Sequence, residues 1–189
     1  MQKMILKNGI TLYHGSYTKV EKINLSNCLD GKDFGSGFYL TSDSEQAAKF
    51  IKTSIAKAKK NKSIEENVAL GYVSVFKFEK IYDISIFDFK KPDKKWLHYV
   101  AGNRKKGIFE EELNELQEYD IVSGKIANDA TNRVITAYIN NVYGEPGSHF
   151  ADRTAISLLL PNKLSNQICF KTQTAVSCLE FVKAIEVQL

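Results

Sequence analysis

Short apolar runs separated by turn residues predict six or seven strands along the chain. The predicted strands are residues 10–13, 37–41, 70–78, 81–89, 119–122, 167–171 and 181–187. The run at 70–78 is the clearest of them, because it is rich in the β-branched and aromatic residues that strands favour. Asn8-Gly9 is a strong turn signal, so the first strand is expected to begin at Ile10 and to end at His14-Gly15-Ser16.

Helical periodicity fills the segments between these strands. Ala47, Ile51, Ile55 and Ala58 form one apolar stripe, and a capping box at Ser42 is expected to begin that helix. Further helices are expected after Asp93, over 110–118, after Asn128 or Asp129, over 151–160 and briefly after Thr172 or Thr174. Since strands and helices do not alternate regularly, we expect an α+β fold with short strands in largely antiparallel or mixed sheets and helices inserted between them.

Length and composition set the general class. The chain has 189 residues, of which 43% are hydrophobic, so we expect a single domain over residues 1–189. No apolar run reaches the roughly 18 residues of a membrane span, and the N-terminus lacks a secretory pattern. The three cysteines form no CxxC pair and the three histidines are far apart, which predicts reduced thiols, a cytoplasmic location and no metal site.

Two lysine-rich clusters carry much of the positive charge. One lies at 57–62 and the other at 90–95, with residues 104–106 close behind. They could contact the phosphates of a nucleic acid. A solvated lysine surface is the favoured reading, because 22 acidic residues nearly balance the 26 basic ones and the first cluster suits the end of a helix.

Two polar stretches are candidates for a ligand site. His14-Gly15-Ser16 lies at the end of the first strand, and glycines at 31, 35 and 37 surround Asp33 and Phe34. These glycines allow positive φ angles or a close approach to a ligand, but a strand follows them, so they are not a dinucleotide-binding fingerprint. Each candidate also has an ordinary structural explanation. His14 could be satisfied by a backbone bond, Tyr39 could be a core residue, Asp33 a turn residue and Gln167 a strand start.

Four segments together resemble a known family. They are LYHGS at 12–16, DFGSGFYLT at 33–41, DIVSGKIAND at 120–129 and QICF at 167–170. They are similar to bacterial domains of unassigned function of the DUF3990 type, which are related to ADP-ribosyltransferases, and the resemblance covers almost the whole chain. It implies an ADP-ribosyltransferase-like fold with a site of the histidine–tyrosine–variable type. His14, Tyr39 and Gln167 match its three catalytic positions.

The resemblance implies NAD as the substrate and a role for each residue. His14 would bind a ribose hydroxyl, the Gly15 backbone would bind the nicotinamide amide, and Tyr39 would stack on the nicotinamide ring. The remaining NAD-binding residues that it implies are Ser16, Asp33, Phe34, Gly35, Gly37 and Phe38. Asp120, Asn128 and Asp129 are candidates for the acceptor side, although they could also be helix or strand caps.

Gln167 departs from the best-known pattern, in which a glutamate stands at the third position. Glutamine can hydrogen-bond a hydroxyl, but it carries no charge and cannot act as a base. The resemblance therefore leaves two hypotheses. One is a mono-ADP-ribosyltransferase that modifies a protein or nucleic acid as a bacterial toxin or defence effector, with an antitoxin as a candidate partner. The other is a weak or inactive module that binds NAD or ADP-ribose.

Overall fold

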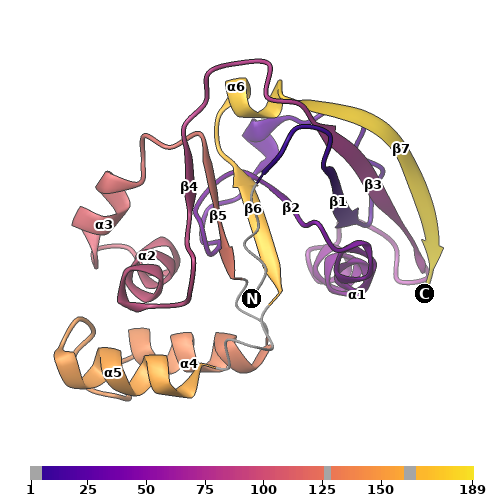
Figure 1. The fold of residues 1–189 in the computed structure, drawn as a ribbon. Helices are drawn as coiled ribbons and strands as arrows, with labels where there is room; N and C mark the ends of the chain where they lie inside the picture. Colours follow the sequence, from indigo (N-terminus) through magenta and orange to yellow (C-terminus); the bar gives the residue numbers. More distant parts are fainter. Residues whose placement is uncertain (1–5, 126–128, 160–164) are drawn as a thin grey trace.

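Two sheets pack face to face and helices cover their outer faces (Figure 1). The computed structural model describes residues 6–125, 129–159 and 165–189, with only the backbone at 129 and 130. The first sheet is antiparallel, in the order β1 (Thr11–Ser16), β3 (Leu70–Phe78), β7 (Leu179–Gln188). The second has the order β2 (Phe38–Leu40), β6 (Asn166–Phe170), β5 (Ile121–Lys125), β4 (Ile86–Asp88), in which β4 and β5 are parallel. The expected α+β class with mixed sheets is confirmed.

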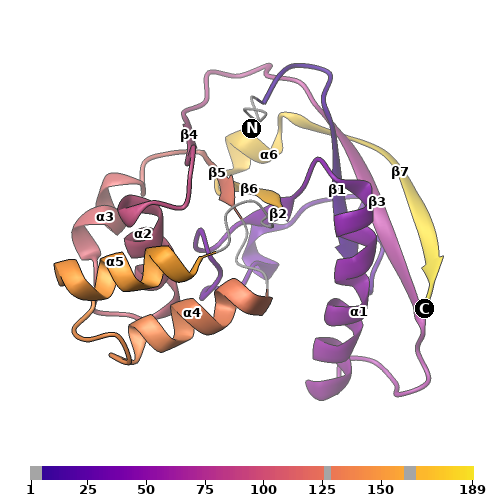
Figure 2. The same cartoon turned by 60° about the horizontal axis from the view of Figure 1, so that its bottom comes forward.

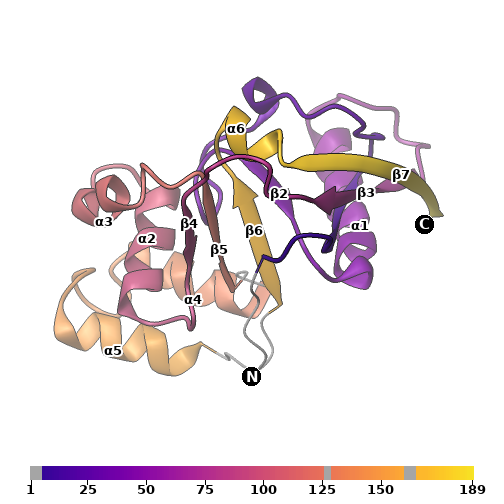
Figure 3. The same ribbon diagram turned by 45° about the horizontal axis from the view of Figure 1, so that its top comes forward.

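The helices divide between the two sheets. Helix α1 (Ser44–Lys60) lies along the outer face of β1 and β3, as Figure 2 shows from below. The other side of the molecule carries α2 (Lys94–Arg104), α3 (Glu110–Glu115), α4 (Asp129–Ile139) and α5 (His149–Leu158). A 3-10 turn (Leu25–Asn27) lies between β1 and β2, and the short α6 (Gln173–Val176) joins β6 to β7. Figure 3 shows β7 at the outer edge of the first sheet, with the C-terminus at its end.

Strand alternation sorts the side chains into two main cores. The inter-sheet core is formed by residues such as Leu12, Phe38, Phe76, Ile168 and Phe170. The helix-side core lies between the second sheet and α2, α4 and α5, and includes Phe34, Trp96, Val122, Tyr138 and Cys169. Gln167 alternates with Ile168 along β6, so its side chain lies on the helix side together with that of Cys169.

The apolar stripe on α1 is confirmed, but the predicted helix start is wrong. Ala47, Ile51, Ile55 and Ala58 are the buried residues of the helix. The N-cap is Asp43 rather than Ser42, because the Asp43 carboxylate accepts hydrogen bonds from the amides of Glu45 at 2.9 Å and Gln46 at 3.1 Å.

Three strands, β1, β5 and β7, run further than predicted, and three elements, β2, β4 and α3, are shorter. β1 continues through Ser16 because its last residues pair with Tyr72 and Val73 of β3. β5 continues through Gly124 to Lys125 because these residues pair with β6. Gly124 lies within the strand and packs closely: a Cβ there would lie 2.9 Å from the Cβ of Phe89. The predicted strand at 81–89 shortens to β4, and the helix predicted at 110–118 ends at Glu115.

A buried polar cluster ties the helices together. The Nδ1 of His98 lies 2.7 Å from Glu112, and its Nε2 lies 3.0 Å from the Asp152 carboxylate. The Tyr138 hydroxyl donates to the same carboxylate and accepts from the Gly147 amide. Since these residues come from α2, α3, α4, α5 and the loop before α5, the cluster holds the four helices to one another.

Candidate functional site

His14 is held by the edge of the neighbouring strand β2. Its Nδ1 lies 2.8 Å from the carbonyl oxygen of Tyr39, and its ring centroid lies 4.5 Å from that of Phe38. A carbonyl can only accept, so Nδ1 carries the proton and Nε2 keeps a lone pair. Burial lowers the pKa of His14 and outweighs the opposing effect of the bond to Tyr39. The ring is therefore neutral near neutral pH and presents Nε2 as a hydrogen-bond acceptor.

Gly15 lies at the edge where the two sheets diverge. Among the described residues, β1 is joined to the residue that follows β2 by one isolated bridge, with bonds of 2.8 and 3.0 Å between Tyr13 and Thr41. Because antiparallel pairing alternates, the Gly15 amide and carbonyl face the same way as those of Tyr13, away from β3. The Gly15 side also touches α1: a Cβ there would lie 1.8 Å from the Ala47 carbonyl oxygen. The glycine is thus required by helix packing, whatever its backbone binds.

Ser16, the next candidate, is buried at the end of β1. Its hydroxyl accepts from the amide of Thr18 at 3.3 Å and lies 3.5 Å from the Thr18 hydroxyl. The Ser16 side chain therefore closes a local turn at the start of the following loop.

The Tyr39 hydroxyl is bonded to the loop at residues 33–37. It accepts from the amide of Phe34 at 3.0 Å and donates to the carbonyl of Gly35 at 2.7 Å. Burial raises the pKa of Tyr39 well above its ordinary value, so the phenol stays protonated and keeps both bonds. The Tyr39 side chain thereby fixes the loop against the second sheet.

The other residues of the 33–37 loop have mainly structural contacts. Phe34 is completely buried, and its ring packs in the helix-side core, 5.9 Å from the Phe89 ring. Gly35 has a φ of +80°, so a positive φ occurs at this glycine as expected. A Cβ on Gly37 would lie 2.4 Å from the sulfur of Cys169, which explains this glycine by close packing. Phe38 points into the inter-sheet core.

Asp33 links the loop to Gln167 and Arg104. One carboxylate oxygen of Asp33 accepts from the Arg104 Nε at 2.9 Å and from its Nη2, and the other accepts from the Gln167 Nε2 at 3.0 Å. Asp33 and Gln167 are 8% and 7% exposed, so this is a buried polar group. In the sequence, Arg104 stands out only as a member of a basic cluster. No local signal reveals the pair, because its members lie 71 positions apart.

Tyr39 and Gln167 lie on the same face of two adjacent strands. Tyr39 pairs directly with Cys169, and Gln167 is two residues further along β6. Such diagonal neighbours are about 7–8 Å apart. The structure therefore brings the Tyr39 and Gln167 side chains together under the 33–37 loop, while the His14 ring meets the backbone of Tyr39 from the inter-sheet side.

The candidate acceptor residue Asp120 lies away from Gln167. Gln167 pairs with Gly124 at one end of β5, whereas Asp120 immediately precedes the other end. The Asp120 carboxylate accepts from the Thr172 hydroxyl at 2.6 Å and from the Ser85 amide and hydroxyl at 2.9 and 3.0 Å. Asp120 therefore joins β4, β5 and α6. Asn128 lies outside the described residues, and Asp129 is the first residue of α4.

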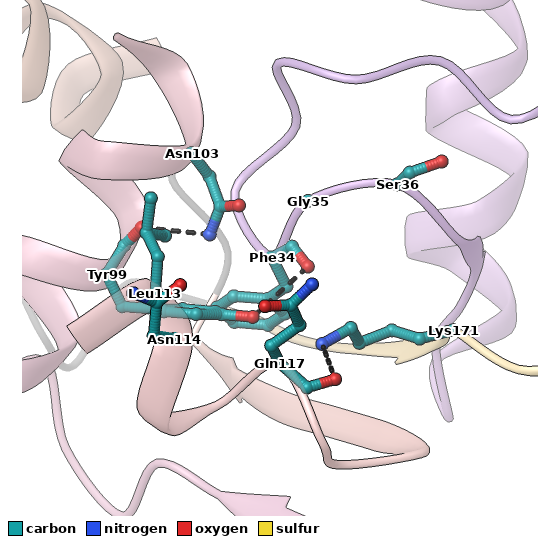
Figure 4. A pocket seen from close by; sticks show the side chains of 9 residues that line it. All are labelled: Phe34, Gly35, Ser36, Tyr99, Asn103, Leu113, Asn114, Gln117 and Lys171. Carbon is teal, nitrogen blue, oxygen red and sulfur yellow. Dashed lines mark hydrogen bonds between the residues drawn. The ribbon is translucent and has the colours of Figure 1, made fainter. Parts of the chain in front are cut away.

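An open cavity of about 320 Å³ lies beside the 33–37 loop, between α2 and α3 (Figure 4). Its lining residues are Phe34, Gly35, Ser36, Tyr99, Asn103, Leu113, Asn114, Gln117 and Lys171. Figure 4 shows the Lys171 ammonium donating to the Gln117 carbonyl, at 3.2 Å. His14, Tyr39 and Gln167 do not line this cavity, whereas Phe34 and Gly35, two of the predicted NAD-binding residues, do.

Several residues of the lysine-rich clusters have partners on the protein itself. Lys90, Lys94 and Lys95 lie 2.6, 3.4 and 2.5 Å from carboxylates of Asp88, Asp152 and Glu115. Arg104 points inward to Asp33, as described above. These contacts favour the structural explanation of the second cluster.

Two general findings bear on the class of the protein. No described helix combines the length and apolar character needed to cross a bilayer. Within the described segments, no group of three or more histidine, cysteine, aspartate or glutamate side chains is arranged to hold a metal ion.

Comparison with known proteins identifies a family. No curated protein matches the sequence. The model of a family of proteins of unknown function, DUF3990, matches residues 10–181, which include His14, Tyr39, Gln167 and the 33–37 loop. The match spans most of the chain, and the protein belongs to the DUF3990 family.

Proposed function

We propose that the protein is an NAD-dependent mono-ADP-ribosyltransferase, an enzyme of the glycosyltransferase class, with an ADP-ribosyltransferase-like fold. It would modify a macromolecular acceptor, protein or nucleic acid, as a bacterial toxin or defence effector. The observation that carries the proposal is the 2.8 Å contact between the His14 Nδ1 and the Tyr39 carbonyl oxygen, which directs Nε2 to a ribose hydroxyl. The placement of Tyr39 and Gln167 on adjacent strands supports it.

The proposed residues act by binding and orientation. In the transfer, the bond between the ribose C1′ and nicotinamide breaks and its electron pair leaves with nicotinamide. An acceptor nucleophile then donates a pair to C1′ and loses its proton. His14 and Gln167 would hold the ribose hydroxyls, and the Gly15 backbone would hold the amide of the leaving group. Since a glutamine cannot take the proton, the acceptor or solvent must remove it.

The test follows free nicotinamide after incubation with NAD, with and without a bacterial lysate. We expect release that depends on the lysate, is lost in His14→Ala and is unchanged in the control His149→Ala, which removes an exposed histidine. Tyr39→Phe keeps the ring but removes the two loop bonds, so reduced release there would report on the loop. Equal release by wild type and His14→Ala would refute the proposal.

The alternative is a module that binds NAD or ADP-ribose without transfer. The uncharged Gln167 favours it, because stabilisation of the developing positive charge is often the largest part of catalysis. It predicts that NAD raises the melting temperature while no nicotinamide appears with any lysate.

A labelled product would instead reveal whether the acceptor is protein or nucleic acid. Transfer to nucleic acid should weaken steeply as salt rises.

A further inference from the structure

The Asp33 carboxylate determines which way the Gln167 amide faces. An ionised carboxylate only accepts hydrogen bonds, so the amide nitrogen of Gln167 must be the atom that lies 3.0 Å from Asp33. The amide oxygen then points away from Asp33. Without this partner, the two ends of the amide could exchange places by a rotation about the last side-chain bond.

Arg104 holds Asp33 in the position that this contact needs. The guanidinium donates to one Asp33 oxygen and, through Nη1, to the side chain of Asn132 on α4. The Asp33 oxygen that faces Gln167 is thereby oriented from α2. Because the positive charge of Arg104 and the negative charge of Asp33 offset each other, the pair orients the Gln167 amide without adding net charge to the site.

We propose that Asp33 is a positioning residue for Gln167, which it holds with the amide oxygen presented to a ribose hydroxyl of NAD. This inference rests on the proposed function. It also determines the expected effect of introducing a glutamate at position 167. The carboxylate introduced by Gln167→Glu would lie next to the Asp33 carboxylate, and two carboxylates at this distance do not both ionise readily. The glutamate is compatible with the site only when position 33 provides a donor.

The test uses four proteins: wild type, Asp33→Asn, Gln167→Glu and the exchange variant Asp33→Asn/Gln167→Glu. We expect Asp33→Asn to lower the kcat of nicotinamide release about tenfold or more, because the Gln167 amide loses its fixed direction. The exchange variant keeps an amide–carboxylate bond with the roles reversed. It is therefore expected to recover most of this loss.

The pH profile separates positioning from a purely structural role. Gln167→Glu can imitate the wild-type contact only while one proton bridges its two carboxyl groups. Its activity relative to wild type should therefore fall as pH rises, and that of the exchange variant should not. The described titratable groups around the pair are Arg104, Lys32, Tyr39 and Cys169. Burial raises the pKa of Cys169 to about 12 and that of Tyr39 well above its ordinary value. Lys32 is present in all four proteins, so comparison with the wild-type pH profile removes its contribution.

Wild-type kcat in Asp33→Asn, or a Gln167→Glu activity that rises with pH, would overturn the inference. If wild type releases no nicotinamide, the proposed reaction is wrong. The contact between positions 33 and 167 is then tested by itself, from the unfolding midpoints of the four proteins over the same pH series. Gln167→Glu should then lose stability relative to wild type as pH rises, while the exchange variant follows wild type. Parallel curves for all four proteins would overturn the inference.

Discussion

Gly15 offers a sharp test of how α1 packs on β1. In Gly15→Ala, the new Cβ would lie 1.8 Å from the Ala47 carbonyl oxygen and 2.7 Å from its carbon, whereas ordinary contacts begin at 3.4 Å. The helix and the strand must therefore separate by about 1.6 Å at this point. The obstructing atoms belong to a helix backbone that is fixed by its own hydrogen bonds, so they cannot rotate away as a side chain could.

The expected cost is at the upper end of the range for overpacking, about 3 kcal/mol. For a chain of this length, this corresponds to a melting temperature lower by about 6–12 °C. Thermal unfolding followed by circular dichroism measures the shift. The control is Gly107→Ala: Gly107 has nothing within 4 Å of an added Cβ, but its φ is +83°. The control variant carries only backbone strain, about 1 kcal/mol.

A second variant makes the reasoning specific. Replacing Ala47 by glycine in the Gly15→Ala protein should not restore stability, because the contact is with the backbone of Ala47 and not with its methyl group. A melting temperature of Gly15→Ala within about 2 °C of wild type would refute the packing explanation. It would leave ligand binding as the reason for a glycine at this position.

Two further predictions concern titrating side chains. Burial lowers the pKa of His14, so the unfolded chain binds the proton more tightly than the folded protein, and the free energy of unfolding should decrease as pH falls below 6.5. In urea unfolding, His14→Gln should lack the part of this decrease that comes from His14. An unchanged pH dependence in His14→Gln would contradict the burial of the ring. Burial raises the pKa of Asp120, but hydrogen bonds from Thr172 and Ser85 outweigh this effect and lower the pKa below 3.8. Asp120→Ala should therefore lower the free energy of unfolding, measured with urea at neutral pH, by about 2 kcal/mol. Nicotinamide release per folded molecule should stay at the wild-type level, and a specific loss of release would return Asp120 to the candidate site.

Local patterns predicted the features that depend on neighbours along the chain. The β3 strand at residues 70–78 and the buried stripe of α1 follow from side-chain periodicity, because burial of one face repeats with the period of the element. The caps at Asp93 and Thr172 were also predictable, since each bonds an amide three residues ahead. The α+β class followed from the order of these elements.

Local patterns failed where strand pairing or an alternative cap decided the boundary. His14-Gly15-Ser16 and Ser123-Gly124 have the composition of strand ends, but pairing with β3 and β6 continues both strands through them. Asp43 replaces Ser42 as the N-cap, a difference of one residue between two good capping side chains.

The sequence by itself determined the elements and the residue types of the candidate site, including His14, Tyr39 and Gln167. Only the tertiary structure decided how these residues are used. It separated Asp120 from Gln167, turned Arg104 from a surface cluster to Asp33, and bonded Asp33 to Gln167 across 134 positions. The physical reason is that a buried charge or amide takes whichever partner the packing of distant elements brings within hydrogen-bond distance, and that choice leaves no periodic trace along the chain.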